Sequence, residues 1–257
     1  MTAMIPVKLN GQWDLTLPAH RALRPEWVPH TDKDGNWKEG WEPERLNAMH
    51  QVIQPGDTVV DVGAEEGDMS ALCALWAGPT GGVILVEPNP KVWPNIRAIW
   101  DANDSLAPVV DWFVGFAAAV TDYTPPFDDV TRISDWVDGW PRCAYGDIIG
   151  DHGFRHLAQQ ADATPRTTLD DLVAFADVIT MDVEGAELEV IKGSLGLLAA
   201  RKPVVFISIH PEFMRDMYGQ HPDELHTYMQ AAGYRSRLIA TDHEQHWVFW
   251  HPDGRQA

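Results

Sequence analysis

Four groups of ionisable side chains in this 257-residue sequence could bind a ligand or move a proton. They are Asp61 with the turn that follows it, Glu87, Asp182 with Glu184, and His210. Carboxylates and an imidazole exchange protons near neutral pH, and carboxylates also attract cationic ligands. None of these side chains is an evident nucleophile. We therefore expect a reaction whose reactive group comes from a cofactor, while the protein moves protons.

Each group follows a short apolar run, several of them rich in β-branched residues, which is typical of strands buried on both faces of a parallel sheet. The predicted strands span 58–62, 83–86, 109–114, 178–181 and 203–209. Helical segments separate them, and 234–239 with 245–250 predict a closing antiparallel pair. This alternation predicts a doubly wound α/β sheet, in which ligands bind outside the carboxyl ends of the strands. The four groups should meet there.

The turn after the first of these strands limits the chemical class of ligand that could bind there. A dinucleotide-binding turn needs a second glycine two residues after Gly63, and this chain has Glu65 there. Glu66 and Asp68 follow around Gly67, and this negative charge would repel a pyrophosphate. It would suit S-adenosylmethionine, which carries a sulfonium and an ammonium group and no phosphate. A tight turn with an acidic helix start explains the same residues equally well.

Five stretches resemble the FkbM family of S-adenosylmethionine-dependent methyltransferases. They are 59–63 (VVDVG), 86–90 (VEPNP), 119–122 (AVTD), 167–170 (TTLD) and, most specifically, 181–193 (MDVEGAELEVIKG). The resemblance implies a class I methyltransferase fold, with a Rossmann-like sheet of seven strands whose last strand is antiparallel. It also implies methyl transfer from S-adenosylmethionine, usually to a hydroxyl oxygen of a sugar, a glycan or a small natural product.

The resemblance also assigns residues to the cofactor. The first strand end and its turn would hold the methionine end, Glu87 would accept hydrogen bonds from the ribose hydroxyls, and Ala118 would lie near the adenine. Asp182 would face the transferring methyl group. The cofactor-binding residues expected on this basis are Asp61, Gly63, Ala64, Glu65, Gly67, Glu87, Ala118 and Asp182.

A hydroxyl acceptor needs a base. We hypothesise that His210 is this base and that Asp182 or Glu184 orients it, so these three residues are the catalytic candidates. The alternative is that His210 with Pro211 only turns the chain out of its strand. The family commonly has a glutamate near this strand end, where this chain has Ser208-Ile-His210, and the difference bears on the identity of the substrate.

We predict no resident metal, because carboxylates clustered at strand ends need none. The alternative is a divalent cation on Asp182, Glu184, His210 and Glu212. Oxygen-rich ligation would suit Mg²⁺, although histidine is more common on transition metals.

Two segments depart from the α/β pattern. Residues 1–42 carry four tryptophans among prolines and glycines, and we predict an irregular appendage packed on a methyltransferase domain over 43–257. Residues 121–165 form an aromatic-rich insertion that is a candidate substrate lid. The alternative, which the sequence supports equally well, is a surface segment that packs around a small hydrophobic core of its own.

Composition limits the partners. The chain has 38 acidic and 19 basic residues, and its net charge of −19 opposes binding to nucleic acid or to an anionic membrane surface. No apolar run is long enough to span a membrane, the first residues lack the layout of a signal peptide, and two cysteines make a disulfide framework improbable. We expect a soluble, cytoplasmic protein that binds a small molecule or glycan. Its oligomeric state is left open.

Two other functions remain open at this point. One is an NAD-dependent oxidoreductase or epimerase on a similar sheet, although the acidic turn argues against it. The other is a methyltransferase-like module that binds its ligand without turnover.

Overall fold

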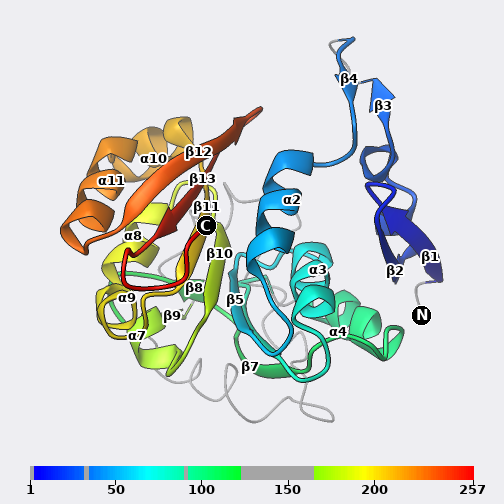
Figure 1. The fold of residues 1–257 in the computed structure, drawn as a ribbon, viewed down its shortest axis with the longest axis horizontal. Coiled ribbons are helices and arrows are strands. Elements are labelled where there is room, and N and C mark those ends of the chain that lie inside the picture. The colour runs from blue at the N-terminus through cyan, green and yellow to red at the C-terminus, as the bar shows by residue number, and fades with distance from the viewer. Residues whose placement is uncertain (1–2, 32–34, 90–91, 123–164) are drawn as a thin grey trace.

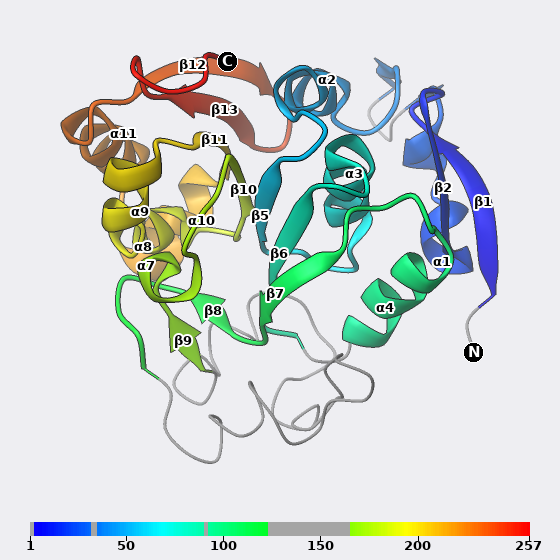
Figure 2. The same ribbon diagram turned by 60° about the horizontal axis from the view of Figure 1, so that its bottom comes forward.

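The fold is built on one seven-stranded sheet with helices on both faces (Figures 1 and 2). The computed structural model describes residues 3–31, 35–89, 92–122 and 165–257. The strands of this sheet are β5 (Thr58–Val62), β6 (Gly82–Val86), β7 (Val109–Phe113), β10 (Val178–Asp182), β11 (Val204–Ile209), β12 (Arg235–Thr241) and β13 (Gln245–Trp250). Every strand predicted from the sequence is present, with ends that agree within two residues.

The order of the strands in the sheet is β12-β13-β11-β10-β5-β6-β7. All run parallel except β13, which pairs antiparallel with β11 and with β12. The predicted sheet, including its antiparallel last strand, is confirmed. Because β5 lies between β6 and β10, the turn that follows β5 is at the centre of the carboxyl edge.

Helices connect these strands and cover the sheet. They are α2 (Pro43–Val52), α3 (Asp68–Ala77), α4 (Trp93–Asp101), α7 (Leu169–Leu172), α8 (Glu187–Lys192), α9 (Leu195–Arg201), α10 (Pro211–Tyr218) and α11 (Pro222–Ala231). A short parallel pair, β8 (Phe116–Ala117) with β9 (Arg166–Thr167), lies beside the main sheet. No helix in the described part of the chain combines the length and apolar character needed to cross a bilayer.

The central strands are apolar on both faces because each face supports its own core. Val59 and Leu85 pack in the core that also contains residues of α2, α3 and α4. Val60 and Val62 pack in the core that contains residues of α8, α9, α10 and α11. Complete burial of a valine side chain contributes roughly 1.5–3 kcal/mol, so these two layers hold the strand ends firmly in place.

The N-terminal segment is more regular than expected. An antiparallel hairpin of β1 (Met4–Leu9) and β2 (Trp13–Pro18) is followed by α1 (Ala19–Ala22), a 3-10 turn at Pro25–Trp27, and the short pair β3 (His30–Thr31) and β4 (Trp37–Lys38). Asn10 and Gly11 form the hairpin turn in the left-handed conformation. Trp13, Leu15 and Leu17 pack into the core on the α3 side. The Asn-Gly pair and this alternation are the signals from which the hairpin could have been predicted.

The insertion predicted over 121–165 lies outside the described residues, apart from Thr121, Asp122 and Pro165. Its assignment as a substrate lid stays a prediction.

Candidate active site at the carboxyl edge of the sheet

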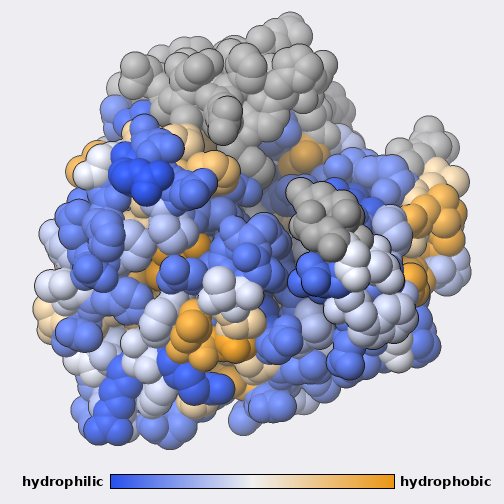
Figure 3. Space-filling view, turned by 90° about the horizontal axis from the view of Figure 1, so that it is seen from above, coloured by the Kyte–Doolittle hydropathy of each residue, from blue (hydrophilic) through white to orange (hydrophobic). Residues whose placement is uncertain are grey.

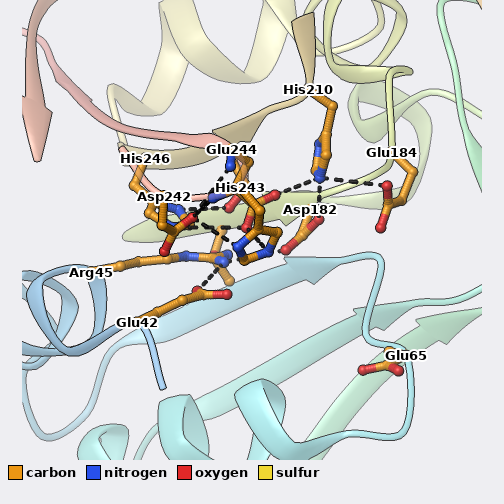
Figure 4. A network of polar contacts seen from close by, with 12 residues as sticks. Glu42, Arg45, Glu65, Asp182, Glu184, His210, Asp242, His243, Glu244 and His246 are labelled. Atoms are coloured by element: carbon orange, nitrogen blue, oxygen red, sulfur yellow. Dashed lines mark hydrogen bonds and ion pairs between the residues drawn. The ribbon is translucent and has the colours of Figure 1, made fainter. Parts of the chain in front are cut away.

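The strand ends bring together the three predicted catalytic residues. His210 Nε2 lies 3.7 Å from Asp182 Oδ1 and 3.4 Å from Glu184 Oε2. Figure 4 shows these side chains facing one another from the ends of β10 and β11, with Glu244 and His243 from the turn between β12 and β13 beside them. The parallel arrangement of the strands therefore brings two of the four predicted groups into contact, Asp182 with Glu184 and His210.

His210 is held by carboxylates at both ring nitrogens. Glu187 Oε1 lies 2.9 Å from Nδ1, and Glu244 Oε2 is in direct contact with Nε2. Burial opposes protonation of the imidazole, but the carboxylates outweigh it and raise the pKa of His210 to about 11. An imidazolium cannot accept a proton, so these surroundings do not support the hypothesis that His210 is the base.

The carboxylates of this cluster respond to burial and to one another. Burial, together with neighbouring carboxylates, raises the pKa of Asp182 and raises the pKa of Glu184 to about 7. Burial also disfavours the charged form of Glu244, but His210 and Arg45 outweigh it and lower the pKa of this carboxyl. The cluster therefore concentrates negative charge at one point of the sheet edge.

Arg45 of α2 belongs to this site although no sequence signal pointed to it. Its Nη1 lies 2.7 Å from Glu42 Oε2 and 3.2 Å from Asp182 Oδ2, and its Nη2 donates to Thr180 Oγ1 at 3.3 Å. Burial opposes its charge, but Glu42 and Asp182 hold the pKa of Arg45 above its usual value. Arg45 thus ties α2 to β10 and fixes one oxygen of Asp182 (Figure 4).

The N-terminal segment supplies basic groups to the acidic turn after β5. Arg21 bonds Glu65 at 3.0 and 3.2 Å and pairs with Asp68, while His20 pairs with Glu66. The negative charge expected at this turn is therefore partly neutralised, because the hairpin places α1 next to the start of α3 and each carboxylate gains a basic partner.

Glu87 at the end of β6 is oriented by backbone groups. Its Oε2 accepts a hydrogen bond from the Glu65 N–H at 2.8 Å, and its Oε1 accepts one from the Asn89 N–H at 2.7 Å. Burial raises the pKa of Glu87 to about 8, although both N–H groups oppose the shift. Each carboxylate oxygen has a further lone pair with which it could accept a ribose hydroxyl.

A cavity of about 200 Å³ lies between the turn after β5, α2 and the β12–β13 turn. Seven carboxylates and three guanidinium groups line it: Glu42, Asp61, Glu65, Asp68, Asp182, Glu184 and Glu244, with Arg21, Arg24 and Arg45. This excess of negative charge favours a cationic ligand over a phosphate. The surface of the same end of the molecule is mostly hydrophilic where it is described (Figure 3).

Backbone strain is concentrated at this cavity. Glu42, Glu65 and Glu184 have φ values of 41°, 48° and 52°, in the left-handed region that non-glycine residues avoid. They are three of the five non-glycine residues with positive φ in the described ranges. Strained residues persist where the surrounding structure holds them, and such places are commonly functional sites.

The remaining residues predicted to bind the cofactor lie in two places, the turn after β5 and a second hollow beside α10. Gly63 and Gly67 flank the buried Ala64 in the turn after β5, and both glycines have positive φ, at 85° and 88°. Ala118 instead lines a second hollow of about 280 Å³ with Ala186 and Tyr218. Its place near an adenine stays a prediction.

Glu212, the fourth residue of the metal alternative, does not join the others. It is exposed in the first turn of α10. Among the described residues, the potential ligand atoms that lie within 4.8 Å of one another include those of Asp182, Glu184 and His210, without Glu212. The prediction that Glu212 is a ligand was wrong. Because α10 begins directly after His210, Glu212 lies in the first turn of this helix and its side chain is exposed to solvent instead of facing Asp182 and Glu184.

Several solved structures share features of this fold. The methyltransferase FkbM from Methylobacillus flagellatus KT is 17% identical, with 80% of this chain and 50% of that chain covered and a TM-score of 0.49. Aeropyrum pernix fibrillarin in complex with natively bound S-adenosyl-L-methionine is 11% identical, with 97% and 100% covered and a TM-score of 0.44. The magnesium protoporphyrin IX methyltransferase from Synechocystis PCC 6803 with bound S-adenosylmethionine is 12% identical, with 81% and 80% covered and a TM-score of 0.45.

This chain therefore spans half the length of the Methylobacillus protein. A search of curated proteins gave no match. Residues 61–236, which include the turn after β5, Glu87 and the cluster around Asp182, match the methyltransferase FkbM domain. Because this match covers more than half of the sequence, the chain belongs to the FkbM methyltransferase family.

Proposed function

We propose that this protein transfers a methyl group from S-adenosylmethionine to a hydroxyl oxygen of a sugar, a glycan or a small natural product. The observation that carries the proposal is the acidic cavity at the end of β5, in a chain of the FkbM family. Its lining fits a cationic cofactor and is unsuited to the pyrophosphate of NAD. The net charge of −19 supports a small-molecule or glycan acceptor over nucleic acid, and we place the protein in the cytoplasm.

The residues present fit the cofactor. Gly63 and the turn to Gly67 would hold the methionine end near Asp61, and Glu87 would accept the ribose hydroxyls. When bound, S-adenosylmethionine supplies an electrophilic methyl group. The protein has to place the acceptor oxygen in line with that methyl group and exclude water from it.

The proton of the acceptor hydroxyl would leave toward the carboxylates at the end of β10. Asp182 and Glu184 both line the cavity, and their side chains are 30% and 22% exposed. His210 is enclosed by carboxylates and is 8% exposed. We therefore assign proton acceptance to Asp182 and Glu184, and we assign His210 to positioning them.

Calorimetric titration with S-adenosylmethionine and, as a control, NAD tests the cofactor. We expect saturable binding of S-adenosylmethionine alone, because only this ligand matches the charge of the cavity. Formation of S-adenosylhomocysteine in the presence of candidate acceptors would then establish turnover. Binding of NAD alone would overturn the proposal, and binding of the cofactor without product from any acceptor would support a module that no longer turns over.

Binding of 5′-methylthioadenosine should tighten as the pH is raised from about 6 to about 9. This ligand has the adenosine but not the titrating amino acid, so the pH dependence reports on Glu87. The carboxyl of Glu87 is neutral below its pKa of about 8 and accepts ribose hydroxyls best when ionised. Affinity should rise by up to about tenfold per pH unit below that value and then level off.

Glu87→Gln serves as the control for this measurement. It should bind methylthioadenosine more weakly and with a flat pH profile, because it has no carboxylate to ionise. A pH-independent affinity of the unchanged protein would contradict the assignment of Glu87 to the ribose.

A further inference from the structure

The imidazole of His210 is oriented as in a metal-ligating histidine. Its Nδ1 is fixed by Glu187, whose side chain is fully buried and lies 2.9 Å away. Its Nε2 is directed at three carboxylates, those of Asp182, Glu184 and Glu244. A carboxylate that holds one ring nitrogen while the other nitrogen faces oxygen ligands is the arrangement by which proteins orient metal-bound histidines.

Glu244 provides a second, independent sign of a missing ligand. Its side chain is almost completely buried, and neither carboxylate oxygen accepts a hydrogen bond of good geometry, although Oε2 touches His210 Nε2 and Oε1 lies 3.4 Å from His243 Nε2. A buried carboxylate normally has hydrogen-bond donors or a cation on its oxygens, because burial of a charge without them is costly. A single proton on Nε2 can satisfy only one of the three carboxylates that surround it.

The spacing of Asp182 Oδ1, Glu184 Oε2 and His210 Nε2 suits one ion, and these three residues offer atoms within 4.8 Å of one another. Atoms that ligate the same ion at ~2.1 Å lie roughly 3–4.2 Å from one another. Nε2 of His210 lies 3.7 Å from Asp182 Oδ1 and 3.4 Å from Glu184 Oε2. Asp182 can offer Oδ1 because Arg45 engages its other oxygen, Oδ2.

We propose that Asp182 Oδ1, Glu184 Oε2 and His210 Nε2 form a binding site for a divalent cation, with Glu187 fixing the histidine from behind and Glu244 in contact with Nε2. Two carboxylate oxygens and one imidazole nitrogen favour an ion that accepts both donor types, and Mn²⁺ matches this set better than Mg²⁺ or Ca²⁺. The ligands come from the ends of β10 and β11, so the sheet brings them together before any ion binds. Binding of the ion would release to solvent the proton that Nε2 carries in the ion-free protein.

Two neighbouring groups of acids and histidines suit an ion less well. In the group of Glu42, Glu244 and His246, the carboxylate of Glu42 is already paired with the buried Arg45, whose charge would repel a cation. In the group of Asp242, His243 and Glu244, the imidazole of His243 is largely exposed, and the carboxylate that holds its Nδ1, at 2.9 Å, is Asp242, which is itself a member of the group. The centre on His210 is therefore the one that we assign.

The ion would lie at the wall of the cavity assigned to methyl transfer. A cation at this place would lower the pKa of a hydroxyl that coordinates it, and the hydroxyl proton would then leave to solvent water and not to Asp182 or Glu184. This role rests on the proposed function, whereas ion binding itself does not.

Titration of chelator-treated, dialysed protein with Mn²⁺, followed by the electron paramagnetic resonance signal of unbound Mn²⁺, tests the site. We expect one Mn²⁺ per chain with micromolar affinity, and a melting temperature that rises when Mn²⁺ is added. Glu184→Gln should weaken binding by about tenfold or more, because it removes a charged ligand, and Glu244→Gln should weaken it as well, because it removes a buried negative charge beside the ion. Glu212→Gln, an exposed glutamate two residues after His210, is the matched control and should bind as the unchanged protein does.

The outcomes separate this inference from the proposed function. Absence of Mn²⁺ binding at millimolar concentration, or equal affinity in all three variants, would overturn the cation site. Thermal melts of the metal-free variants verify that each is folded, and the partly exposed Glu184 provides a variant with little risk to the core. Titration with S-adenosylmethionine in excess chelator tests the cofactor site separately.

Discussion

Gly63→Ala is expected to abolish most of the affinity for S-adenosylmethionine and to destabilise the fold. Gly63 has φ of 85°, and a Cβ atom at this position would lie 1.9 Å from the backbone oxygen of Asp182. The left-handed conformation costs a non-glycine residue about 1–2 kcal/mol, and the collision adds a further ~1–3 kcal/mol. Relief of the collision has to separate the end of β5 from the end of β10, the two strand ends that form the cavity.

Gly78→Ala is the matched control for Gly63→Ala. Gly78 ends α3 with φ of 65°, and no atom lies within 4 Å of the position that its Cβ would occupy. It should lose about 1–2 kcal/mol from the conformation alone and keep its affinity. Denaturant unfolding and calorimetry of both variants make the comparison, and similar losses in the two would show that the contact with Asp182 is unimportant.

Arg45→Met should lower the free energy of unfolding by about 3–5 kcal/mol at neutral pH, because it leaves buried carboxylates without their cation. Arg45 is 2% exposed and pairs with Glu42 and Asp182, of which Glu42 is 6% exposed. The double variant Arg45→Met with Glu42→Gln should recover part of the loss, since it removes one of the two orphaned charges. Urea unfolding of the two variants provides the measurement.

The loss in Arg45→Met should also depend on pH, in a direction that follows from Glu42. Burial already raises the pKa of Glu42, and Arg45 is the main group that opposes the shift. Without Arg45 the folded-state pKa rises further above the unfolded value. A raised carboxyl pKa disfavours folding increasingly as the pH rises from the unfolded to the folded pKa, so the deficit should be larger at pH ~8 than at pH ~5. A deficit independent of pH would contradict this account.

The strands and their convergence could be predicted because they depend on local pattern and on a general rule of parallel sheets. The apolar runs at 58–62 and 178–181 predict strands that are buried on both faces. These strands are apolar on both faces because helices cover the sheet on each side. Once these strands were placed, Asp182, Glu184 and His210 had to meet at the carboxyl edge. The FkbM resemblance, most specific over 181–193, agreed with the family match.

The charge state of the site could not be predicted in the same way. Arg45 reaches Asp182 across 137 residues of sequence, and Arg21 reaches Asp68 across 47. Such pairs depend on how α2 and the N-terminal hairpin pack on the sheet, and each residue by itself resembles an ordinary surface charge. Glu187 was within the most specific motif, but only its contact with Nδ1 of His210 shows what it does.

The sequence by itself determined the strands of the sheet, the polar residues that lie at their carboxyl ends, and the family. Hydrophobic periodicity and short motifs are local properties of the chain, and these three features depend on them. Tertiary structure alone decided whether His210 is a base or a cation in the ion-free protein, since that depends on four carboxylates from two separate segments, 182–187 and the β12–β13 turn, around one ring. A pKa reflects the summed field and burial at one point in space, and neither quantity is a property of neighbouring residues in the sequence.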